Sequence, residues 1–316
     1  MRHLLAKLLP FAFLTALVLA LALAKPSFIK AKNVADILRF SSVVVIMGVG
    51  MTFVIVSGGI DLSVGSVLAF ASIIVAWCST AGLPLWASLA IGILTGTLWG
   101  LLNGALIVFL GLPPFVATLG TMWMARGSAQ LLARAITGLS TSIEVTAPGF
   151  DTLGSGALFG FAPVAVVIMF LVVAIGHYVL NHTRLGRYSF AIGSNVEAAR
   201  YSGIPVRWYT LLVYVLLGTL TGLAAMIEAS INRGGHATLG VTYELQVIAA
   251  VVIGGASLNG GQGTILGTLT GALIMGVIRN GCIQLNLDYD WQFVIVSALI
   301  IVAVAFDMFQ RRRTGA

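Results

Sequence analysis

Side chains able to do chemistry are sparse in this sequence, and most of them stand alone. Only 9% of the 316 residues are charged, whereas soluble domains carry about 25%. The ionisable candidates within long apolar runs are Arg126, Arg134, Glu228 and Asp307. Isolated charges in such runs are costly, and they usually face a polar path or a charged partner. The sequence therefore offers separate polar positions rather than a clustered catalytic site.

Nucleotide-binding and hydrolytic motifs are missing from the sequence. The last lysine is Lys32, so no GxxxxGK[ST] phosphate loop follows it, and none precedes it. No GxSxG or HExxH motif occurs, and Cys78 and Cys282 have no metal-type spacing and are interpreted as packing residues. The four histidines are scattered: His3, His177, His182 and His236. We predict that this chain is no enzyme and binds neither a metal nor a cofactor.

The elements that must position the polar residues are membrane-spanning helices. Hydrophobic residues make up 59% of the chain, and a spanning helix needs about 20 of them. The length of 316 residues then holds about ten helices, so we expect one all-α polytopic membrane domain over residues 1–316 and no folded soluble domain. The predicted apolar segments are 8–24, 41–58, 63–81, 86–109, 114–136, 161–180, 209–231, 244–258, 264–281 and 292–309.

Two parts of this assignment stay open. The run ending near residue 24 follows Arg2 and Lys7 and is either a retained first helix, which we favour, or a cleaved signal peptide. Segments 244–258 and 264–281 are joined by glycine-rich sequence that suits either a plain turn or a re-entrant break. Small residues within the spans favour close helix packing in lipid.

The distribution of basic residues predicts the orientation. With the N-terminus inside, nine basic residues fall on the cytoplasmic side and six outside, as the positive-inside rule favours. We therefore expect both termini in the cytoplasm. The net charge of +7 has no basic stripe with interleaved aromatics, so we expect no nucleic-acid partner. The cytoplasmic set is Arg2, Lys7, Arg184, Arg187, Arg200, Arg207, Arg311, Arg312 and Arg313, and the outer set is Lys25, Lys30, Lys32, Arg39, Arg233 and Arg279.

The first specific motif is GGIDLSVG at residues 58–65. Gly58 and Gly59 break a helix, and Asp61 or Ser63 can cap the next helix by accepting backbone N–H bonds. The motif predicts a tight helix–turn–helix at the membrane face. Asp61 is interpreted as that cap or as a contact with a partner subunit.

The second motif lies in the only long loop expected on the cytoplasmic side, residues 181–208. Asn195 is a suitable N-cap and Gly203 a suitable stop for a short helix over 196–201. A two-turn helix outside the membrane either docks a partner or lies on lipid headgroups. We expect it to dock a partner.

The third motif, at residues 243–264, contains Gly254 and Gly255. Its Gly-Gly-x-x-Leu-x-x-Gly core aligns with residues 58–65. We expect both turns on the cytoplasmic side. Internal repeats are common in transporters, and this alignment indicates one weakly.

These three motifs, together with PFVATLGT at 114–121 and Arg126-Gly127, resemble the ribose and other monosaccharide permeases of ATP-binding cassette importers. The resemblance covers about residues 33–309. It implies a type II-like permease fold in a bacterial inner membrane, a second permease subunit, a sugar-binding protein outside, and ATPase subunits that bind ATP and Mg²⁺. It further implies that the ATPase-coupling residues are Gly193, Asn195, Glu197, Ala198, Ala199, Arg200, Ser202 and Gly203.

The solute path is less defined by sequence. Arg126 is expected about 18 Å into its span, facing either a water-filled pore or a structural partner such as Glu228 or helix-end carbonyls. Glu228 has the same two interpretations. Candidate contacts outside are Glu144, Asp151, Arg233, His236, Asp288 and Asp290. Alternatives to sugar import are a permease for branched-chain amino acids or another small polar solute, and a stand-alone secondary carrier.

Overall fold

The protein is predominantly helical in the computed structural model, which describes residues 2–158, 162–288, 290–292, 294–299, 301–302 and 305. Two short antiparallel strand pairs, β1–β4 and β2–β3, accompany the helices. The helices are α1 (Arg2–Ala24), η1 (Pro26–Ile29, a 3-10 helix), α2 (Ala31–Val56), α3 (Val64–Thr80), α4 (Leu85–Val108), α5 (Pro114–Thr137), α6 (Thr152–Ser155), α7 (Val164–His182), α8 (Arg184–Ser194), α9 (Val196–Tyr201), α10 (Val206–Ile231), α11 (Tyr243–Ile253) and α12 (Ile265–Gln284). The strands are β1 (Ser142–Glu144), β2 (Ala157–Leu158), β3 (Ala162–Pro163) and β4 (Gly234–His236).

The described helices agree in position with the first nine predicted segments, but not all are full spans. Five of them, α2, α4, α7, α10 and α12, are long and apolar enough to cross a membrane. The expected count of about ten spans is not confirmed, and segment 292–309 is described only at residues 292, 294–299, 301–302 and 305. At about 1.5 Å per residue, the 11 residues of α11 extend only about 16 Å, about half of a bilayer core.

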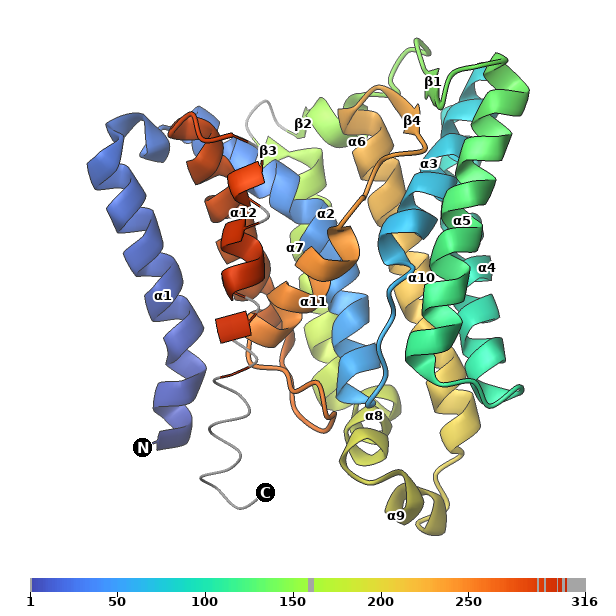
Figure 1. Cartoon of the computed structure of the whole chain (residues 1–316), viewed down its shortest axis with the longest axis vertical. Coiled ribbons are helices and arrows are strands. Elements are labelled where there is room, and N and C mark those ends of the chain that lie inside the picture. Colours follow the sequence, from blue (N-terminus) through green and yellow to red (C-terminus); the bar gives the residue numbers. More distant parts are fainter. Residues whose placement is uncertain are drawn as a thin grey trace.

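Helix α2 is the centre of the bundle (Figure 1), and its apolar window is 89% buried. A helix that is apolar all round is stable only when other helices surround it. On one side α12 packs between α2 and α1, where Leu14 and Leu17 of α1 pack in one cluster with Ile37 of α2 and Val277 of α12. The N-terminus and the α8–α9 unit lie at the same, lower end of the molecule, and β1 and β4 lie at the opposite end.

Helices α4 and α10 pack through glycines. Gly92, Gly96 and Gly100 recur every four residues on α4, and Gly218 and Gly222 do so on α10. A Cβ atom on Gly96 would lie 2.3 Å from the carbonyl oxygen of Gly218, so nothing larger than hydrogen fits there. Such small-residue stripes allow backbones to approach closely in lipid, where apolar burial alone drives little association.

Helices α3 and α11 both begin inside the molecule rather than at its faces. From the lower end of α2 an extended segment, residues 57–63, rises to the start of α3, and from β4 a series of turns, residues 237–242, descends to the start of α11 (Figure 1). The predicted tight helix–turn–helix at residues 58–65 is therefore wrong. Gly58 has φ +81° and makes the turn, but the chain then runs inward before the next helix starts.

Candidate functional site

The loop at 181–208 contains the predicted short helix, α9. The Asn195 side chain accepts a hydrogen bond from the backbone N–H of Ala198 at 2.9 Å, and this caps the first turn. Gly203 follows the helix with φ +81°, a conformation that glycine adopts without strain. The predicted helix, cap and stop are confirmed.

The solvent-facing side of α9 carries a charged pair and an aromatic side chain. Arg200 Nη1 lies 3.0 Å from Glu197 Oε1, and both side chains are more than half exposed. Tyr201 is 87% exposed, whereas Ala199 is buried against the rest of the protein. Ala198, Ser202 and Gly203 are exposed as well. Helix α9 therefore presents a small, mixed polar and aromatic surface beyond the bundle.

Sequence reasoning missed the helix that carries α9. Residues 184–194 form α8, which packs on the lower end of the bundle through Gly186, Ser189 and Ile192. Tyr188 of α8 meets Tyr209 of α10 edge-to-face, with ring centroids 4.6 Å apart. The amphipathic spacing of buried residues three apart was the signal that could have indicated α8.

All three sequence motifs meet at Gly193, the second-last residue of α8. A Cβ atom there would lie 1.8 Å from the carbonyl oxygen of Val56, the last residue of α2, and 2.7 Å from the backbone nitrogen of Gly261. The Gly261 N–H itself donates to that Val56 carbonyl at 2.8 Å. The turns that follow α2 and α11 are thus in backbone contact with the α8–α9 unit.

The glycine turn after α11 is a plain connection on the same end. Gly254 packs on the backbone of Gly267 in α12, and Gly255 has φ +90° with open space around it. Thr264 then caps α12 by accepting the N–H of Gly267 at 3.0 Å. Of the two options for this sequence, the turn is the one observed, and the helical structure is instead interrupted before α11, at the turns of residues 237–242.

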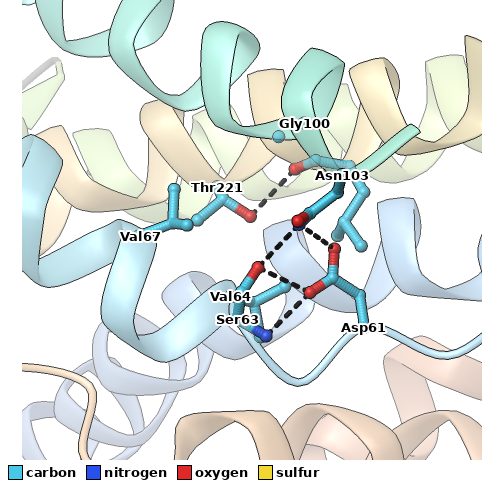
Figure 2. Close-up of a pocket in the computed structure, with 9 residues that line it drawn as sticks. Asp61, Ser63, Val64, Val67, Gly100, Asn103 and Thr221 are labelled. Atoms are coloured by element: carbon cyan, nitrogen blue, oxygen red, sulfur yellow. Dashed lines mark hydrogen bonds between the residues drawn. The ribbon is translucent and has the colours of Figure 1, made fainter. Parts of the chain in front are cut away.

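Asp61 lies in the extended segment before α3 and is buried (Figure 2). Its Oδ1 accepts bonds from the backbone N–H and the hydroxyl of Ser63, both at 2.7 Å. Asn103 of α4 donates to Asp61 Oδ2 at 3.1 Å, and Thr121 of α5 donates to Asn103 Oδ1 at 2.6 Å. Neither Asp61 nor Ser63 accepts a bond from the first turn of α3 among the described contacts, so the helix-cap prediction is wrong. Through these hydrogen bonds, Asp61 instead links its own segment, residues 57–63, to α4 and, by way of Asn103, to α5.

Arg126 lies near the middle of α5 and binds backbone carbonyls. Its Nη1 donates to the carbonyl oxygens of Ala237 and Leu239, each at 2.7 Å. These residues belong to the turns at 237–242 that descend from β4 to α11. The predicted pairing with Glu228 is wrong, because that carboxylate has other partners.

Glu228 of α10 accepts hydrogen bonds from Tyr243 at 3.1 Å and from the Asn232 amide at 3.3 Å. Tyr243 is the first residue of α11, and Arg279 of α12 interacts electrostatically with both Glu228 and Tyr243. Arg279 also lies over the Phe40 ring of α2, 5.1 Å from its centroid. Glu228 is thus the centre of a polar network that fixes the start of α11 between α10 and α12.

Four of the six residues predicted as outer contacts gather at the β1–β4 end. Arg233 pairs with Asp151 at 2.9 Å, and both side chains are exposed. Glu144 and His236 lie on the paired strands β1 and β4. Asp288 and Asp290 follow α12 in the chain.

Among the described residues, five helices long and apolar enough to cross a membrane, together with sparse interior charges, indicate a multi-pass membrane protein. A family model described as "Branched-chain amino acid transport system / permease component" matches residues 33–304, so the chain belongs to that family. No solved structure matches it.

Curated relatives of this chain are named as sugar permeases. The ribose import permease of Haemophilus influenzae is 39% identical over 95% of this chain and 92% of that protein. The ribose import permease of Bacillus subtilis is 39% identical over the same share of each chain. The D-allose transport system permease of Escherichia coli K12 is 35% identical over 93% of this chain and 90% of that protein. The resemblance inferred from the motifs is confirmed.

Proposed function

We propose that this chain is the membrane permease subunit of an ATP-binding cassette importer for a monosaccharide, located in a bacterial inner membrane. The observation that carries the proposal is the similarity, over more than nine-tenths of the chain, to permeases named for ribose and allose import. The family description names branched-chain amino acids, but the three relatives from Haemophilus influenzae, Bacillus subtilis and Escherichia coli are named for sugars. Because no phosphate-binding loop occurs in the sequence, ATP is bound and hydrolysed by partner ATPase subunits.

The α8–α9 unit is the docking point for that ATPase in this proposal. Its exposed pair, Glu197 and Arg200, and the exposed Tyr201 supply contacts of both charge types and one aromatic anchor. The docking end is then cytoplasmic, the N-terminus with it, and the β1–β4 end faces the binding protein outside. A second permease chain completes the pore, and about ten spans per chain fit the predicted segments.

The transport proposal is tested by reconstituting the permease with its ATPase and binding protein in proteoliposomes. We expect ATP-dependent uptake of one member of a panel containing ribose, allose and galactose, and no uptake of leucine. Uptake of leucine alone would establish the amino-acid alternative. Sugar uptake driven by an ion gradient without ATP would establish a secondary carrier.

The docking proposal is tested by reversing charges on α9. In Glu197→Lys or Arg200→Glu the ATPase is expected to bind at least about tenfold more weakly, since close interfacial charge pairs couple by about 1.5 kcal/mol or more. Transport per ATP hydrolysed falls with it, while membrane insertion is unchanged. Reversal at Asp151 or Arg233, an exposed ion pair at the opposite end, is the matched control for ATPase binding. Unaltered ATPase binding by both α9 variants would refute the docking site.

A further inference from the structure

Two broken helices meet in the interior of the bundle. The start of α3 touches the segment leading to α11, since a Cβ atom on Gly65 would lie 2.1 Å from the carbonyl oxygen of Gly240. Non-helical backbone at membrane depth is tolerated only where protein buries it or where it lines a water-filled cavity. In transporters, discontinuous helices of this kind form solute sites near the midplane.

The depth of this junction follows from α5. Arg126 is 12 residues from the first residue of α5, Pro114, and 11 from the last, Thr137, so it lies about 18 Å from the first residue. It binds the carbonyl oxygens of Ala237 and Leu239. The descending segment is thus held beside the middle of α5 by a guanidinium that remains partly exposed.

Glu244 brings a carboxyl group to the same place. It lies in the first turn of α11 and interacts electrostatically with Arg126. Its Oε2 lies 2.7 Å from the position that a Cβ on Gly65 would occupy, next to the first turn of α3. One carboxyl group therefore stands beside the positive ends of two helices and near a guanidinium. Only the fold brings Glu244 to Arg126, so nothing in the local sequence marks this carboxyl group.

Thr242, immediately before α11, has a strained backbone conformation and a side-chain hydroxyl without a hydrogen-bond partner among the described residues. Its φ is +67°, the left-handed region that a β-branched residue rarely adopts. Among the described residues, its Oγ1 is buried and without a hydrogen-bond partner. Backbone strain of about 1–3 kcal/mol and an unpaired hydroxyl of similar cost persist mainly at functional sites.

The junction is open on one side. Trp123, one turn from Arg126 on α5, is 69% exposed, and Val241 and Leu245 are about half exposed. Thr238, between the two carbonyls that Arg126 binds, is exposed too. An aromatic and aliphatic surface with a few convergent polar groups is the usual composition of a small-molecule site.

We propose that the junction of α3 and α11 is a transient sugar-contacting point on the translocation path, at which Arg126, Glu244 and, once the junction opens, the buried Thr242 hydroxyl bind sugar hydroxyl groups. The proposal rests on the proposed function, because it takes its ligand class from it. Contacts here are few, and this suits a path whose specificity is set by a separate binding protein.

The first test measures water access. In a background with Cys78 and Cys282 replaced by alanine and shown to transport, Thr238→Cys and Val241→Cys are exposed to a charged, membrane-impermeant thiosulfonate. Leu171→Cys is the matched control, since Leu171 is 60% exposed near the middle of α7. We expect the two junction cysteines to react at least about tenfold faster than the control, and sugar supplied during turnover to slow them.

The second test measures the polar contacts. Thr242→Val keeps the shape and removes the hydroxyl, whereas Thr242→Ser keeps the hydroxyl. We expect sugar uptake per ATP hydrolysed to fall about tenfold in the valine variant, as for one lost bond of about 1.4 kcal/mol, and to stay near wild type in the serine variant. Glu244→Gln is expected to alter the relative uptake of the panel sugars without altering ATPase binding.

The outcomes separate the two proposals. If the wild-type complex takes up no sugar, the proposed function fails. If the wild type transports sugar but the junction cysteines react no faster than the α7 control, the junction is not on the path. Equal uptake by the valine and serine variants would likewise overturn the role of the hydroxyl.

Discussion

The contact at Gly193 makes a sharp prediction for Gly193→Ala. The added methyl carbon would lie 1.8 Å from the Val56 carbonyl oxygen, whereas real contacts of this kind do not fall below 3.0 Å. Helix α8 must therefore retreat from α2 by about 1.2 Å, the difference of those two distances. The opposing atoms are backbone, so no side chain can rotate away to absorb the change.

We expect two consequences of that retreat. Overpacking against rigid backbone costs about 3 kcal/mol, the upper part of the usual range, and at about 2–4 °C per kcal/mol the melting temperature falls by about 6–12 °C. Displacement of α8 also moves α9 relative to the bundle, so ATP hydrolysis and sugar uptake become less tightly coupled.

Thermal melting of the purified permease and uptake per ATP hydrolysed in proteoliposomes measure these two effects. Gly120→Ala adds the same methyl on α5, where nothing lies within 4 Å, and is expected to behave as wild type. A Gly193→Ala protein with wild-type melting and coupling would refute the reasoning, because the backbone contact would then be absent or easily relaxed.

Three further predictions concern the bundle interior. Gly96→Ala pushes α4 away from α10, since its Cβ would lie 2.3 Å from a carbonyl oxygen, and is expected to lower the melting temperature by several degrees relative to Gly120→Ala. Asp61→Asn places a second amide donor opposite the Asn103 amide, across a contact of 3.1 Å. We expect this to lower the free energy of unfolding by about 1–3 kcal/mol, and adding Asn103→Asp to restore most of it. Tyr214→Phe removes the bond to the Ile60 carbonyl at 3.1 Å, and we expect reduced coupling with unchanged ATPase binding. Failure of the Asn103→Asp swap to rescue Asp61→Asn, or wild-type coupling in Tyr214→Phe, would contradict these assignments.

Local sequence signals predicted the elements that depend on local interactions. Asn195 and Gly203 delimit α9 because a cap and a left-handed glycine act within a few residues. Apolar length located the long helices α2, α4, α7, α10 and α12. The α8 helix was missed because its buried face is mostly small and polar, with Gly186 and Ser189 beside Ile192.

The polar interior could not be predicted, because its partners lie far apart in the chain. Asp61 reads as a helix cap in sequence, yet its Oδ2 is taken by Asn103, 42 residues later. Arg126 was expected to face a water-filled pore or to pair with Glu228 or helix-end carbonyls, and it binds carbonyl oxygens of the turns 111 and 113 residues away. Apolar length also cannot distinguish a full span from a half helix preceded by turns, which is the arrangement at α11.

Residues 57–63 connect the proposed ATPase-docking unit, α8–α9, with the proposed sugar-contacting junction of α3 and α11. Gly193 packs against the Val56 carbonyl at the end of α2. Residues 57–63 then run directly from Val56 to the start of α3 at the junction. Extended backbone has little slack, and Tyr214 fixes the segment to α10 at Ile60. A displacement of α8–α9 by the ATPase would therefore shift the start of α3 relative to α11, where Gly65 and Gly240 are already in backbone contact. Because neither glycine can yield by rotating a side chain, we expect that movement to open or close the junction itself.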